Sequence, residues 1–147
     1  MRALHLAVLI LLTLLACAPE SPEARVKKAF EACVKGTESS DPGAVIERLD
    51  TRFEGPGGMD RNGAKLYLLG VLRRDKIGVT VFSNRVEVKG HEALQTTELL
   101  LTSQGGSGLL PQDASRRTFL LRWIEKDGAW RLRALVDTES RGDEGLS

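Results

Sequence analysis

The hydrophobic period of this chain changes once, near Ile77, and this change limits the possible fold more than any other feature of the sequence. Before it, apolar residues recur every three to four positions, a spacing typical of amphipathic helices. After it, apolar and polar residues alternate, as they do in strands with one buried face. Helices and strands in separate blocks indicate an α+β fold in which the helices pack against a sheet.

Three helices are predicted in the first half, each beginning after a residue that can cap backbone N–H groups. The caps are Ser21, Asp41 and Asp60, and proline follows the first two. We expect the first helix to end at Gly36. The apolar faces are Val26, Ala29, Phe30, Cys33 and Val34 in the first helix, Val45, Ile46 and Leu49 in the second, and Ala64, Tyr67, Leu68, Val71 and Leu72 in the third.

Four strands are predicted in the second half, joined as an antiparallel meander, with a short extended piece before the third helix. The piece spans 51–54, and the strands span 77–88, 93–103, 118–126 and 129–138. A change of phase near Val81–Ser83 predicts a β-bulge, and Asp127-Gly128 predicts a tight hairpin. The residues expected to face the helices are Leu99, Leu101, Phe119, Leu121, Trp123, Trp130, Leu132 and Ala134. The glycine-rich segment 104–115 is interpreted as a flexible loop.

The domain, placed at 22–138, resembles the nuclear transport factor 2-like superfamily, which includes ketosteroid isomerase and SnoaL-like cyclases. The resemblance rests on the element order, on the glycine-proline break in 53–60, and on an aromatic strand, Asp-Gly turn and tryptophan in 123–132. It implies a cone in which three N-terminal helices pack on a curved antiparallel sheet of four strands plus the short edge piece. It also implies a cavity inside the cone and a homodimer through the outer face of the sheet. The outer apolar residues would be Leu94, Leu100, Leu120, Ile124 and Leu135.

The N-terminus resembles a bacterial lipoprotein signal. An apolar run from Leu6 to Leu15 is too short to span a bilayer, and the segment Leu14-Leu15-Ala16-Cys17 lies at its end. The resemblance implies that 1–16 is removed, that Cys17 is lipidated, and that 17–21 tethers the domain to a membrane. With alanine after the cysteine, it also implies the outer membrane, facing the periplasm. An ordinary secretory signal cut near Ala18 is the alternative, and 139–147 is predicted to be a flexible tail.

Charge and composition exclude several classes of function. The chain has 21 lysines and arginines against 20 acidic residues, so its charge favours no nucleic-acid partner. Lipidation of Cys17 would leave Cys33 without a disulfide partner, and we expect it to be a buried, inert thiol. Without a cluster of histidines and cysteines, the sequence predicts no metal site or cofactor.

Two functional interpretations remain open for the cone. Isomerase-like catalysis is disfavoured, because Gly55 stands where the resemblance places the catalytic base and the first helix carries Phe30 rather than tyrosine. A non-catalytic domain that binds a small apolar ligand or a protein partner is therefore expected, with an isomerase or cyclase as the alternative. The candidate pocket residues, each of which could instead pack in the core or face water at a strand end, are Tyr67, Gln95, Thr97, Trp123, Glu125 and Trp130.

Overall fold

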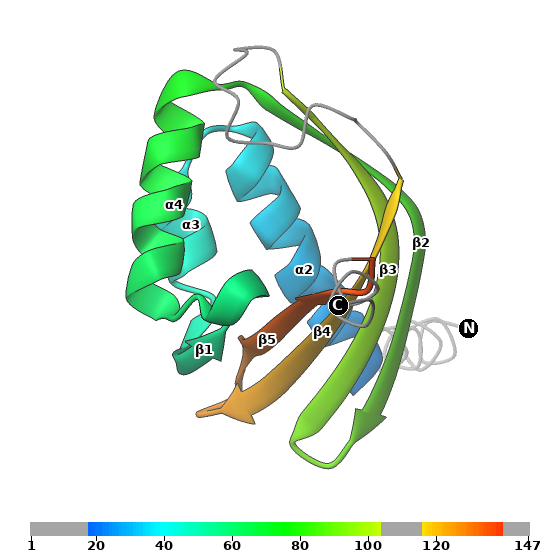
Figure 1. The fold of residues 1–147 in the computed structure, drawn as a ribbon. Helices are drawn as coiled ribbons and strands as arrows, with labels where there is room; N and C mark the ends of the chain where they lie inside the picture. Colours follow the sequence, from blue (N-terminus) through cyan, green and yellow to red (C-terminus); the bar gives the residue numbers. More distant parts are fainter. Residues whose placement is uncertain (1–17, 104–115, 140–147) are drawn as a thin grey trace, which may run out of the picture.

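The computed structural model describes residues 18–103 and 116–139. The predicted signal sequence with Cys17, the glycine-rich segment 104–115 and nearly all of the predicted tail lie outside these residues. In chain order, the described elements are α2 (Pro22–Glu38), α3 (Pro42–Ile46), β1 (Leu49–Glu54), the 3-10 turn η1 (Pro56–Gly58), α4 (Arg61–Arg74), β2 (Ile77–Lys89), β3 (Glu92–Ser103), β4 (Arg117–Lys126) and β5 (Ala129–Asp137). The α+β prediction is confirmed: the helices lie on the concave side of a strongly curved sheet (Figure 1).

The sheet has five strands in the order β1-β5-β4-β3-β2. The predicted meander of β2 to β5 is confirmed, with antiparallel pairing throughout. The expectation of a wholly antiparallel sheet is wrong, because the edge piece is a fifth strand that pairs parallel to β5. Leu49 lies opposite Leu132, whose N–H donates to the carbonyl of Arg48 at 2.7 Å. The sheet is therefore mixed.

All three predicted helix caps are present. Ser21, Asp41 and Asp60 accept hydrogen bonds from backbone N–H groups three residues later, at 3.1, 3.1 and 2.7 Å. The expected end of the first helix is wrong: α2 passes through Gly36 to Glu38. A Cβ at Gly36 would lie 3.1 Å from side-chain atoms of α3, so this glycine allows the two helices to approach closely.

The second helix is shorter than predicted. It ends at Ile46, and Leu49 begins β1 instead of lying on a helical face. Leu49 is nevertheless buried in the core that its apolar character requires.

The bulge predicted near Val81–Ser83 is confirmed at Phe82, where β2 has one residue more than its partner. Val79 pairs with Leu101 before the bulge, and Val86 pairs with Gln95 after it. The extra residue therefore places Val79 and Val86 on the same side of β2, where both pack against the core.

A second bulge, at Arg133 of β5, was not predicted and corrects two placements. Arg122 pairs with Ala134 while Trp123 pairs with Leu132, so Arg133 has no partner position. Ala134 is consequently not on the helix-facing side, and Leu135 is not on the outer face: it packs against the core and lines the interior of the cone. The bulge brings Asp137 to the same side.

Candidate functional site

A cavity of about 560 Å³ lies inside the cone, between α2, α4 and the concave face of the sheet. This volume falls within the range of small-molecule sites. Its walls are mostly apolar: α2 contributes Phe30 and Val34, α4 contributes Leu68, and β3 and β4 contribute Leu99 and Phe119. The surface suits a hydrocarbon body, whose burial would be driven by the hydrophobic effect.

The mostly apolar lining contains one ion pair. Arg117, at the start of β4, donates to Asp137, at the end of β5, over 2.8 Å. The second carboxylate oxygen of Asp137 accepts the backbone N–H of Glu139 at 3.0 Å. The Asp137 side chain is 9% exposed and that of Arg117 is 30% exposed. This is the most polar part of the cavity wall among the described residues.

Three uncharged hydroxyl groups also belong to the lining. Thr97, which is fully buried, donates to the carbonyl of Ser83, and Thr37 donates to that of Cys33, both over 2.9 Å. Burial raises the pKa of Tyr67, so its phenol stays protonated at neutral pH. None of these three groups brings a charge into the cavity.

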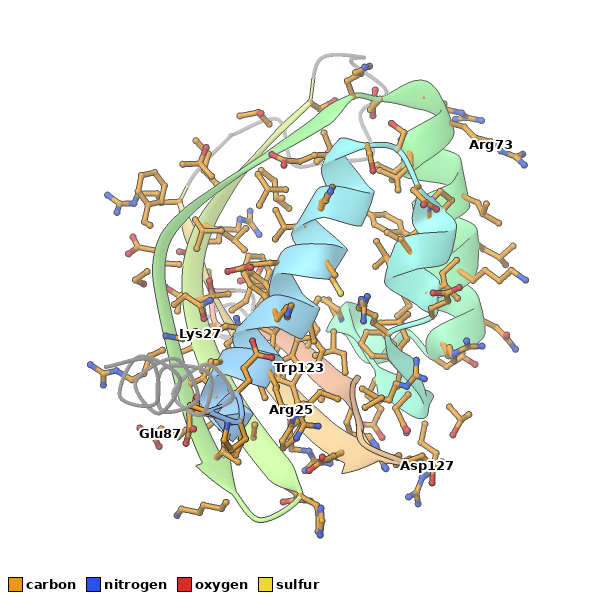
Figure 2. All side chains as sticks on the ribbon, turned by 180° about the vertical axis from the view of Figure 1, so that it is seen from behind. Arg25, Lys27, Arg73, Glu87, Trp123 and Asp127 are labelled. Carbon is orange, nitrogen blue, oxygen red and sulfur yellow. The ribbon has the colours of Figure 1, made fainter. Side chains whose placement is uncertain are left out.

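The structure divides the predicted pocket residues into two groups. Tyr67, Thr97 and Trp123 line the cavity, whereas Gln95, Glu125 and Trp130 do not. Trp130 is buried in the core cluster. Trp123 belongs to the same core cluster as Val26 and Phe30 of α2, and Figure 2 labels it together with Arg25, near the start of that helix.

Gln95 lies outside the cavity and holds the side chain of Trp123 in the cavity wall. It is fully buried, so the interpretation of this residue as a solvated strand end is wrong. Its amide oxygen accepts the indole N–H of Trp123 at 2.8 Å, and its amide nitrogen donates to Asn84 at 2.8 Å. These bonds fix the orientation of the Trp123 ring, which forms part of the cavity wall.

Glu125 connects the far end of β4 to α2. Its carboxylate lies 2.8 Å from the guanidinium of Arg25 and 3.4 Å from the imidazole of His91. The hydrogen bond from Arg25 has the largest effect and lowers the pKa of Glu125. Burial opposes it, and the charge of Arg25 and the contact with His91 lower the pKa further. Glu125 is thus an ionised, half-buried carboxylate outside the cavity rather than a proton acceptor inside the cone.

Cys33 lines the cavity but is poorly suited to nucleophilic chemistry. Burial raises its pKa to about 11, although the charge of Arg48 partly opposes this effect. Because the thiolate is the reactive form, the thiol is a weak nucleophile at neutral pH.

The two positions where the resemblance places a catalytic base and a tyrosine are occupied by residues that have no such functional group. Phe30 contributes an apolar ring to the cavity. A Cβ at Gly55 would lie 3.0 Å from the ring of Phe53, and the neighbouring Glu54 is exposed. Asp137 is the one carboxylate among the described lining residues, and no described group of three His, Cys, Asp or Glu side chains could hold a metal ion.

Sequence reasoning missed Arg117 and Asp137. Arg117 lies one residue before the predicted start of its strand, and Asp137 faces the cavity only because of the bulge at Arg133. The one available signal for this site was an acidic residue at the end of an apolar strand. Because many exposed strand ends also carry an acidic residue, this signal does not distinguish a cavity residue from a solvated one.

No protein-family model and no curated protein matches the sequence. Solved structures do match the fold. A candidate dehydratase of the NTF2-like (nuclear transport factor 2-like) family from Streptomyces avermitilis aligns with 80% of this chain and 95% of its own at a TM-score of 0.68 and 17% identity. An NTF2-like protein from Cytophaga hutchinsonii aligns with 81% and 98% at a TM-score of 0.68 and 11% identity. The chain has the NTF2-like cone fold.

This cone also occurs within a longer protein. The chain spans 38% of Bdellovibrio bacteriovorus Bd1075, and the alignment covers 76% of this chain at a TM-score of 0.66 and 11% identity. At such low identities these likenesses establish the fold of the NTF2-like domain and not its activity.

The outer face of the sheet carries scattered apolar side chains. Leu94 is 49% exposed, Leu100 and Leu120 are half-buried, and Ile124 is buried. Toward the edge of the sheet, Phe82 is exposed beneath the guanidinium of Arg116, at 3.6 Å from the ring centre. A homodimer through this face stays a prediction, which sedimentation equilibrium of the full chain would test. In the described part of the chain, no helix is long and apolar enough to cross a bilayer.

Proposed function

We propose that this protein is a membrane-anchored envelope lipoprotein whose NTF2-like domain binds a small apolar or amphipathic ligand without catalysing its conversion. The observation that carries the binding part is the cavity of about 560 Å³, which is lined mostly by apolar side chains and contains one ion pair. Sites of this size and composition are typical of small-molecule binding proteins. Anchoring rests on the resemblance of Leu14-Leu15-Ala16-Cys17 to a lipoprotein signal.

Catalysis is the weaker alternative. The likeness to a candidate dehydratase favours it, but the identity is only 17%. Asp137, the carboxylate that lines the cavity, is bound to Arg117 at 2.8 Å, and its other oxygen accepts a backbone N–H. Taking up a proton from a substrate would weaken both contacts, so the pair is better suited to recognition than to general-base chemistry.

Ligand binding is tested by blocking the cavity. Leu68→Trp, which places a larger ring in the cavity wall, is expected to lower the amount of small molecule that co-purifies with the full chain at least several-fold, as measured by native mass spectrometry. Leu66→Trp on the same helix is the matched control, because Leu66 is 71% exposed and lies outside the cavity. Equal retention by both variants, or no bound molecule in the unaltered chain, would count against a ligand-binding cone.

Anchoring is tested separately at Cys17. Cys17→Ser removes the sulfur that would carry an acyl chain, so the protein is expected to lose its thioether-linked lipid, detected by the mass of the N-terminal peptide. Cys33→Ser is the matched control and should leave the lipid in place. An unmodified N-terminal peptide in the unaltered protein, beginning near Ala18, would favour ordinary secretion instead.

A further inference from the structure

The single ion pair in the cavity wall constrains the chemistry of the ligand's polar end. We infer that the cavity selects amphiphiles whose polar group is uncharged, such as a hydroxyl or carbonyl, over carboxylates and amines of the same length. The inference rests on the proposed ligand-binding function and specifies it.

The two charges in the cavity wall balance each other. Arg117 and Asp137 are the charged residues among the described lining, and their 2.8 Å contact makes the site electrically neutral as a unit. Asp137 is almost completely buried, and Arg117 and the N–H of Glu139 are among the groups that stabilise its carboxylate. Removing the cation from a buried pair is costly, because an uncompensated charge is left in a poorly solvated site.

A charged ligand would disturb this balance. A carboxylate that bound Arg117 would either displace the guanidinium from Asp137 or bring a second negative charge beside it. An ammonium group would compete with Arg117 for Asp137 and bring a second positive charge beside the guanidinium. In surroundings as apolar as Leu135 and Phe119, such like-charge contacts are weakly screened.

A neutral polar group has no such penalty. The guanidinium carries five N–H donors in a planar fork, and the structure describes one hydrogen bond from them, to Asp137. A hydroxyl or carbonyl oxygen can accept from a remaining donor while the ion pair stays intact. The rest of the ligand would lie against the apolar walls formed by α2, α4 and β3.

The test compares ligands that differ only at the polar end. Ten-carbon alcohol, carboxylate and amine are titrated calorimetrically into the full chain held in lipid nanodiscs, at about pH 8, where the carboxylate is ionised. The alcohol is expected to bind about tenfold more tightly than the carboxylate, since one charged contact is worth about this factor. Asp137→Asn should abolish or reverse this preference, because Arg117 is then free to bind an anion.

Two further variants complete the test. Glu125→Gln makes the same change from acid to amide outside the cavity and should leave the preference unchanged. Arg117→Gln leaves Asp137 as the one charge of the pair and should tighten binding of the amine relative to the alcohol, which gives an independent result if Asp137→Asn does not fold. Partition into lipid is the same for all variants and cancels in the comparison.

The outcomes separate the two claims. Tighter binding of the carboxylate by the unaltered chain, or an unchanged preference in both Asp137→Asn and Arg117→Gln, overturns the inference while leaving ligand binding intact. Absence of saturable binding for all three compounds, in the unaltered chain and every variant, overturns the proposed binding function and the inference with it.

Discussion

Replacing Trp123 with alanine is expected to lower the free energy of unfolding by about 3–5 kcal/mol, as for other large aromatic side chains removed from a packed core. Trp123 is fully buried and contacts both the core and the cavity. Its removal would also leave the amide oxygen of Gln95 without the indole N–H that it accepts at 2.8 Å. Equilibrium unfolding in urea, monitored by circular dichroism, measures this loss.

Two companion variants separate packing from hydrogen bonding. Trp123→Phe keeps an aromatic ring but removes the N–H donor, and it should cost about 1–3 kcal/mol. Leu66→Ala, on the exposed side of α4, should change the free energy of unfolding by less than about 0.5 kcal/mol. A Trp123→Ala variant as stable as Leu66→Ala would show that the ring is not part of the structural core.

Local signals predicted much of this fold because their physical causes are themselves local. A capping side chain such as Asp60 bonds an N–H three residues away, and alternation along a strand depends on its own residues. The bulge at Phe82 could be inferred because the apolar phase changes visibly on its two sides. Such features need no knowledge of distant parts of the chain.

The missed features depend on contacts between distant segments. The sequence Leu132-Arg133-Ala134-Leu135 fits either phase of a strand, so nothing local shows that Arg133 is bulged. The parallel pairing of Leu49 with Leu132 likewise joins segments that are far apart in the sequence, so no local pattern predicts it. Because the bulge places Asp137 in the cavity wall, an error of one residue in the phase of β5 was enough to conceal the ion pair.

The buried carboxylate of Asp50 joins the two strands whose pairing the sequence did not predict. It lies 2.8 Å from the ammonium of Lys126 and 3.0 Å from the guanidinium of Arg133, and it accepts the backbone N–H of Arg52 at 2.9 Å. Asp50 itself is 3% exposed. One carboxylate on β1 is therefore shared between Lys126 and the arginine that the bulge in β5 positions beside it.

Asp50→Ala is expected to lower the free energy of unfolding by about 2–3 kcal/mol at neutral pH. Loss of one partner from a fully buried pair costs about 3–5 kcal/mol, but Lys126 is partly solvated and contributes less. Asp127→Asn in the exposed hairpin is the control for loss of a carboxylate, and it should change stability little. If the two variants were equally stable, the cluster would not hold β1 to β5.

The same cluster should make stability depend on pH in a predictable direction. Burial raises the pKa of Asp50, but the hydrogen bonds from Lys126 and Arg52 and the charges of Arg133 and Lys126 outweigh it, so the pKa lies below its ordinary 3.8. A carboxyl whose pKa is lower in the folded than in the unfolded protein contributes its full stability above the unfolded value, and loses it as the pH falls through the folded value. Asp50→Asn has no such proton to gain, so the stability difference between it and the unaltered chain should be largest at neutral pH and shrink as the pH falls below about 4. Urea unfolding of both chains across this range measures the difference, and a gap that stayed constant or widened on acidification would mean that the Asp50 carboxylate does not stabilise the folded state through its charge.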